Sequence, residues 1–170
     1  MINAGPLQVY HVDGGLVPGT ETAMPPTQGG VTMEFSFGTL ETLADITGLV
    51  ARDDYYNDMS LNVTVPYTDV TEASELLSLF PRVEDNAISL PVGCNARDDA
   101  IGLVLRPIIC GEVSTDDDDA MWAPLVLPVP DFNPTFSMTE QVIWNVTYKV
   151  YPIDPRGHDF RMMFFGQVGT

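Results

Sequence analysis

The fold is decided by two alternating stretches, Val31-Thr32-Met33-Glu34-Phe35-Ser36-Phe37 and Met59-Ser60-Leu61-Asn62-Val63-Thr64-Val65. In both, every second side chain is apolar, which is the period of a β-strand with one covered and one solvated face. Further strands are predicted at residues 100–109, 122–127, 141–151 and 160–168. The chain has 14 Gly and 14 Pro, many of them at the borders of these apolar runs, where they mark turns. The pattern predicts an all-β protein built as a β-sandwich or barrel.

One amphipathic α-helix is predicted at about residues 70–80. Its apolar positions recur at helical spacing on one side and are Val70, Ala73, Leu76, Leu77 and Phe80. Thr68 or Asp69 supplies an N-cap, and Pro81 follows the last turn. Because one side of this helix is apolar, we expect it to pack against the sheet.

The first thirty residues differ from the rest in their density of chain breakers. They hold one possible strand, Leu7 to Val12, and are otherwise interrupted by glycine and proline pairs. We therefore expect residues 1–30 to form an extended N-terminal arm, ordered mainly by packing on something else, such as a neighbouring subunit. Residues 31–170 are expected to form a single β-sandwich or barrel domain.

Charge separates this chain from most globular proteins. It has 24 acidic and 7 basic residues, a formal charge of −17, and Lys149 as its only lysine. Affinity for DNA depends mainly on cations that neutralise phosphates, so specific binding to DNA is not expected. Binding to anionic membranes is disfavoured for the same reason. With no long apolar stretch and no leader-like start, the chain is expected to be made in the cytoplasm without a membrane anchor.

Candidate catalytic and metal-binding residues are few. His11 and His158 lie at opposite ends of the chain, and no nucleophile elbow, P-loop, dinucleotide fingerprint or HExxH motif occurs. Cys94 and Cys110 lack metal-ligand spacing and are expected to be small buried apolar side chains, with a disulfide open if the fold brings them together. We therefore predict no catalytic residue, no cofactor and no metal site, and the chain is not expected to be an enzyme.

Two groups of residues keep a binding function open. The run Asp116 to Asp119 could attract calcium, but adjacent acids in an extended loop cannot all converge on one ion, so a mobile acidic loop is favoured. A set of aromatic residues could line a carbohydrate groove, although core packing is the commoner fate of such side chains in a sheet. They are Trp122, Trp144, Tyr148, Phe164 and Phe165. A carbohydrate- or calcium-binding β-sandwich therefore stays as an alternative.

From about Gly30 onward, the order of strands, glycines and prolines follows a known pattern. The segments that carry it are Gly29–Phe35, Asp45–Gly48, Ser60–Val65, the helix before Pro81, Val92-Gly93, Ala123–Pro128, Glu140–Tyr148, Pro152–Asp154 and Phe164–Gly166. In this order of features the chain resembles the tail-tube (major tail) proteins of long-tailed bacteriophages. The acidic run and the arm rich in glycine and proline have no counterpart in the resemblance.

The resemblance implies a structural virion protein whose partners are other copies of itself and other tail proteins. Such subunits assemble as stacked, hexameric rings around an acidic channel, through which DNA passes without specific binding. The polar side chains of the two alternating strands would line the channel, and they are Glu34, Ser36, Asn62 and Thr64. Residues 52–58 are interpreted as a long hairpin loop that makes contacts between rings through Asp53, Asp54, Tyr55, Tyr56 and Asp58. A capsid decoration, tail-terminator or baseplate protein is the alternative within the virion.

Overall fold

A computed structural model describes residues 6–12, 20–43, 51–68, 77, 79–80, 82–85, 87–89, 92–130 and 142–166. The strands are β1 (Leu7–Val12), β2 (Glu21–Ala23), β3 (Thr32–Leu43), β4 (Ala51–Tyr67), β5 (Val83–Glu84), β6 (Ala87–Ile88), β7 (Ile101–Ile109), β8 (Glu112–Val113), β9 (Met121–Pro130), β10 (Trp144–Val150) and β11 (Phe164–Phe165). Two short 3-10 helices, η2 (Ala96–Asp99) and η3 (Asp117–Asp119), lie between them. The prediction of an all-β protein is confirmed.

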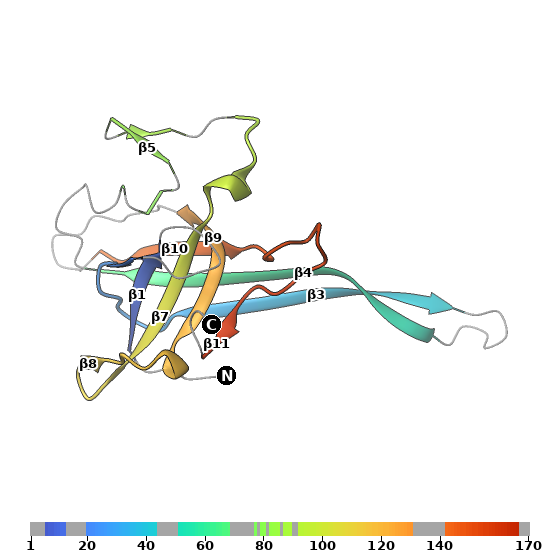
Figure 1. The fold of residues 1–170 in the computed structure, drawn as a ribbon, viewed down its shortest axis with the longest axis horizontal. Coiled ribbons are helices and arrows are strands. Elements are labelled where there is room, and N and C mark those ends of the chain that lie inside the picture. The colour runs from blue at the N-terminus through green and yellow to red at the C-terminus, as the bar shows by residue number, and fades with distance from the viewer. Residues whose placement is uncertain are drawn as a thin grey trace.

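The main sheet is antiparallel and follows the order β2-β1-β7-β9-β10-β4-β3, with β8 paired to β7 and β11 paired to β9. Strand β9 joins two layers, because its first half pairs with β7 and β11 and its second half pairs with β10. Figure 1 shows the two layers crossing, with β3, β4 and β10 running across the steeply inclined β1, β7 and β9. The path through the sheet is open, so the described strands form a sandwich-like fold and not a closed barrel.

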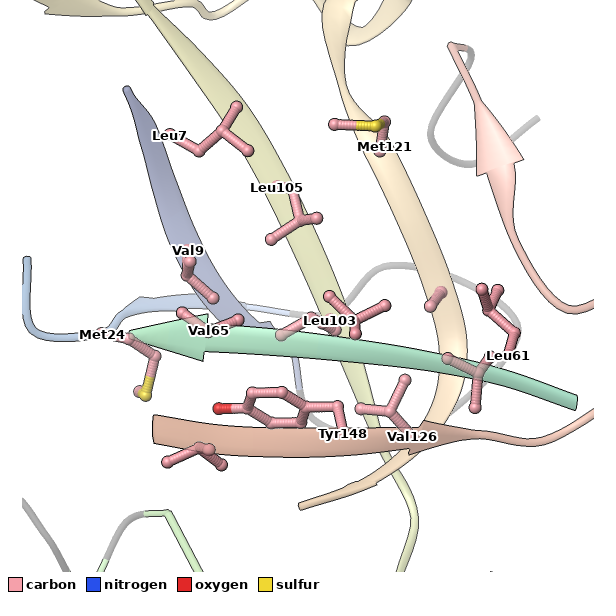
Figure 2. Close-up of a cluster of buried hydrophobic side chains, with 14 of the residues drawn as sticks. Leu7, Val9, Met24, Leu61, Val65, Leu103, Leu105, Met121, Val126 and Tyr148 are labelled. Atoms are coloured by element: carbon pink, nitrogen blue, oxygen red, sulfur yellow. The ribbon is translucent and has the colours of Figure 1, made fainter. Parts of the chain in front are cut away.

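The core lies between these two layers. Every second residue of β1 and β7 faces residues of β4 and β10, as Figure 2 shows for Val9, Leu103, Val65 and Tyr148. Val63, Val65, Leu103 and Val146 are fully buried. The alternation of residues 59–65 in β4 and of β10 therefore packs one side of each strand into the interior and leaves the other side to solvent.

Strands β3 and β4 are much longer than the core requires. They pair from Thr32 and Thr64 at one end to Leu43 and Ala51 at the other. In Figure 1 they leave the body of the molecule together as a two-stranded ribbon. We call the part that runs outward from Phe35 on β3 and Leu61 on β4, as far as Leu43 and Ala51, the β3–β4 ribbon.

The predicted strands agree well with the observed ones. The segments expected at 100–109, 122–127 and 141–151 appear as β7, β9 and β10, while the last one shrinks to the two residues of β11. The helix predicted at 70–80 lies mainly outside the described residues. Of its positions, Leu77 is helical, and the neighbouring Leu79 is fully buried. In the part of the chain that the structure describes, no helix is long and apolar enough to cross a membrane.

The expectation for the N-terminal arm needs a correction where the structure describes it. The strand at Leu7–Val12 is present, but it is an inner strand, paired with β2 on one edge and with β7 on the other. Leu7, Val9 and Met24 belong to the main core. These residues are ordered by the chain's own sheet, because alternating apolar side chains in β1 complete the layer above β4 and β10.

Candidate self-association surface

The β3, β4 and β10 strands carry a polar face that holds the predicted channel residues. Glu34 lies opposite Asn62, and Asn62 lies opposite Lys149 on the next strand. Ser36 occupies the adjacent position on β3, and Thr64 occupies the adjacent position on β4. The structure therefore brings Glu34, Ser36, Asn62 and Thr64 together on one solvent-facing surface, as their alternation predicts. That this surface lines a channel stays a prediction.

The polar face is nearly balanced in charge over the described residues. Its charged side chains are Glu34, Asp58 and Lys149, and the rest are mostly hydroxyls and amides. The hydroxyl oxygens of Thr64 and Thr147 are 3.1 Å apart, which makes a cross-strand hydrogen bond. Many of the described acids lie elsewhere, in η2, β8, η3 and the turn at residues 154–159. This face is therefore rich in uncharged hydrogen-bonding groups.

The segment predicted as a long loop, residues 52–58, is part of strand β4. Tyr56 pairs with Thr39, Tyr55 with Leu40, Asp54 with Glu41 and Asp53 with Thr42. Two register shifts interrupt this ladder, between Gly38 and Thr39 and between Thr42 and Leu43.

Each register shift leaves one extra residue on β4, Asn57 at the first and Arg52 at the second. Such β-bulges break the period of two, which is why the sequence of this segment resembles a loop. The hairpin loop predicted at residues 52–58 is therefore wrong, and residues 44–50, which connect β3 to β4, lie outside the described residues. The predicted contact residues Asp53, Asp54, Tyr55, Tyr56 and Asp58 thus lie along the ribbon.

The opposite face of the ribbon is apolar and open to solvent. Phe35 and Phe37 are 59% and 54% exposed, and Tyr56 is 80% exposed. The ring centroids of Phe35 and Phe37 are 5.9 Å apart, and those of Phe37 and Tyr56 are 5.5 Å apart. Aromatic rings at these separations attract one another and form a continuous surface. Large exposed apolar surfaces on soluble proteins usually mark sites of association.

A groove of ≈ 900 Å³ runs along the root of this apolar face. Its walls are apolar side chains of β3 and β4 on one side and of residues 160–165 on the other, namely Val31, Met33, Phe35, Met59, Leu61, Phe160, Met162, Met163 and Phe165. A second hollow of ≈ 510 Å³ shares Met59, Phe160 and Met162 with it and reaches Tyr56. Sequence reasoning did not identify this groove, because its two walls are far apart in the chain.

The second wall of the groove is held in place by a compact turn. Asp154 and Asp159 exchange two backbone hydrogen bonds of 3.0 and 2.7 Å. The Arg161 guanidinium donates to the Asp159 carboxylate at 2.7 Å, and this hydrogen bond lowers the pKa of that carboxyl group. Arg161 also lies 5.4 Å from the ring centroid of Phe164, within cation–π range. The wall is thus preorganised by the chain itself.

The acidic run is more ordered than expected. Asp117 to Asp119 form η3, and the Asp116 side chain accepts a hydrogen bond from the backbone amide of Asp118. Asp117 pairs with the largely buried Arg106, which also forms an ion pair with Glu21 of β2. Over the described residues, no group of three or more His, Cys, Asp or Glu side chains is placed to hold a metal ion. The run therefore contributes a 3-10 turn, and one of its acids contributes an ion pair.

The histidines and cysteines lie in contrasting surroundings. His11 is buried, whereas His158 is exposed in a turn with a positive φ of 64°. Both Cys94 and Cys110 are free and exposed, which contradicts the expectation that they are buried. Cys110 and Gly111 form the two-residue turn between β7 and β8 with φ values of 54° and 89°, as a type I′ turn requires. Turn geometry, and not burial, places this cysteine.

Most of the aromatic residues considered for a carbohydrate groove belong to the interior. Tyr148 is fully buried and Trp122 is 5% exposed. Trp122 stacks on Phe164 with ring centroids 5.3 Å apart. Of this set, Phe165 is the one that stands in the apolar groove with a mostly exposed side chain.

Comparisons with known proteins give no further guide to this surface. No protein-family model matches the chain, and no curated protein matches it.

Proposed function

We propose that the chain is a structural subunit of the tail tube of a long-tailed bacteriophage, without catalytic activity. In this proposal it assembles with copies of itself into stacked hexameric rings and joins other tail proteins in the virion. DNA passes through the central channel without being bound specifically. The observation that carries the proposal is the β3–β4 ribbon, which projects from the body with one apolar and one polar face.

The edge of the ribbon supports self-association. Among the described strands, β3 pairs only with β4, so its outer edge has backbone groups free to pair with another chain. The exposed rings of Phe35, Phe37 and Tyr56 lie beside this edge. A long edge next to an apolar face is an aggregation hazard in a monomer, and ordered assembly removes that hazard.

The polar face supports a passage for DNA. It presents hydroxyl and amide groups from Ser36, Asn62 and Thr64, with Lys149 as its described cation. A surface with so few cations releases few counterions on contact with DNA, so it gives little nonspecific affinity. In the proposed tube this face lines the channel and the apolar face makes contacts between subunits.

Electron microscopy with light scattering, at low and high salt, tests the proposal directly. Like-charged subunits repel less when salt screens them, so rings or tubes should become more frequent as salt rises. A protein that remains monomeric at every salt and protein concentration would contradict the proposal. Closed single rings that never stack would instead favour a tail-terminator or baseplate component.

A matched pair of variants tests the apolar face. Phe37→Ser removes a ring that is 54% exposed in the single chain, and Ile109→Ser removes an apolar side chain that is 53% exposed at the β7–β8 turn. Both should leave the melting temperature of the monomer almost unchanged, because surface changes rarely cost more than about 0.5 kcal/mol. We expect Phe37→Ser to abolish tubes while Ile109→Ser still assembles. Equal assembly of both variants would exclude the ribbon as the contact surface.

A further inference from the structure

Three buried polar side chains link the two layers of the sandwich. The Nε2 atom of His11, on β1, lies 2.8 Å from the hydroxyl oxygen of Tyr148, on β10. That oxygen lies 2.6 Å from the hydroxyl oxygen of Tyr67, on β4. Both tyrosines are fully buried and His11 is 9% exposed. This chain of hydrogen bonds therefore crosses the core from one layer to the other.

Among the described residues, the surroundings of His11 offer no acid to balance a positive charge. Its pKa is lowered to about 4 by burial alone. The titratable groups on the facing strands are Tyr67 and Tyr148, which burial keeps neutral by raising their pKa values. On its own sheet, His11 lies opposite Thr22 of β2 and Leu103 of β7.

Charged groups near β1 lie on the other side of its sheet. Glu21 lies opposite Val12, and Arg106 lies opposite Gln8, so both alternate away from His11. They bind each other, and Arg106 also binds Asp117. Lys149 is exposed on the far face of β10. A proton on His11 would therefore sit in the core without a counterion, which is costly.

We propose that His11 is an acid-sensitive latch that holds the strand pair β1 and β2 on the sheet. Strands β10 and β4, which carry the two tyrosines, are each paired on both edges. Among the described strands, the β1–β2 pair has one ladder to the rest of the sheet, between β1 and β7. The ion pair between Arg106 and Glu21 also holds it, and just after β2 residues 26–28 form backbone hydrogen bonds with the end of β4. Opening that ladder exposes His11 to water and leaves the ladders of β4 with β3 and β10 in place. It also uncovers the edge of β7.

The direction of the effect follows from linkage. His11 is neutral in the closed state and has an ordinary pKa of about 6.5 when exposed, so protons bind the open state more tightly. Attachment of β1 is therefore strongest above pH 6.5 and weakens as the pH falls toward 4. Each pH unit in this window raises the opening constant by up to about tenfold. Over two pH units the opening constant rises by up to about a hundredfold.

Hydrogen exchange measured by mass spectrometry tests the latch. Protection factors, corrected for the intrinsic effect of pH, are compared near pH 7 and pH 4.5 for peptides covering β1, β4 and β10. We expect protection of β1 to fall by about ten- to a hundredfold while that of β4 and β10 changes by less than about threefold. The chain supplies its own control, because His11 and His158 are its two histidines.

Two variants complete the test. His11→Gln keeps a polar partner for Tyr148 but does not titrate, so its β1 protection should be nearly the same at both pH values. His158→Gln, at an exposed position, should respond to acid as the unmodified protein does. The latch is overturned if β1 keeps its protection at pH 4.5 or if all three strands lose protection together. It is equally overturned if His11→Gln remains as acid-sensitive as the unmodified chain.

Discussion

Tyr148 contacts both layers of the sandwich through its hydroxyl group. Its ring lies in the main core and its hydroxyl contacts both His11 and Tyr67. Sequence alternation places it on the covered side of β10, but nothing in the sequence indicates its two polar partners. They come from β1 and β4, which only the fold brings together. A buried hydroxyl group in such a network stabilises the fold when every member has a hydrogen-bond partner, and an unpaired member is costly.

Replacing Tyr148 by Phe tests this network. The change keeps the ring and leaves His11 and Tyr67 each without a partner in the core. We expect the free energy of unfolding to fall by about 1–3 kcal/mol, measured by urea denaturation at neutral pH. Tyr56→Phe, at a position that is 80% exposed, serves as the control and should change it by less than about 0.5 kcal/mol. Equal stabilities of the two variants would show that the network contributes little.

At the scale of single elements, periodicity predicted the strands well wherever the period of two is unbroken. It placed the first half of β3, the second half of β4, β7 and β10 correctly. It failed at residues 52–58, because two bulges on β4 shift the register and disturb the alternation. It also failed to place β1 inside the sheet, because strand order depends on contacts between distant segments.

The contact of β1 with β7 depends on a glycine. Gly102 lies opposite Val12, and an added Cβ would come within 3.1 Å of the Val12 Cβ and 3.4 Å of its carbonyl oxygen. Gly102→Ala is therefore expected to lower the free energy of unfolding by about 1–3 kcal/mol, as overpacking usually does. Thermal or urea denaturation measures this loss.

Gly30→Ala is the matched control for that change. No atom lies within 4 Å of a Cβ added there, so stability should be almost unaffected. If Gly102→Ala proves as stable as Gly30→Ala, β1 and β7 must separate enough to accept the methyl group, and their packing is looser than the distances indicate.

At the scale of the whole molecule, the composition shows that the chain is strongly acidic but does not show where on the surface the acidic residues lie. A net charge of −17 suggested an acidic lining for any channel, whereas the predicted lining residues lie on a nearly balanced face. The apolar groove was missed, because one wall comes from β3 and β4 and the other from residues 160–165. No local motif marks a surface that is assembled from distant segments.

Divalent cations test whether the acidic surface holds a specific ion. Calcium and magnesium should both raise the melting temperature slightly and equally, because they screen repulsion between acids. A specific calcium site would add stabilisation that grows with the calcium concentration, since only the folded state binds. Differential scanning calorimetry in equal concentrations of the two chlorides measures the difference. A rise of several degrees with calcium alone would revive the calcium-binding alternative.

The position of β1 in the middle of the sheet also governs the order of events during synthesis. The β3–β4 hairpin is local in sequence, so it can pair as soon as residue 67 has left the ribosome. Leu7, however, waits for Pro107, its partner on β7, and the second half of β9 waits for residues 146–150 of β10. Such distant pairings slow folding to the order of milliseconds to seconds. Strand β1 emerges before the β3–β4 hairpin and yet can be placed only after it, so the nascent chain must keep β1 soluble until β7 appears.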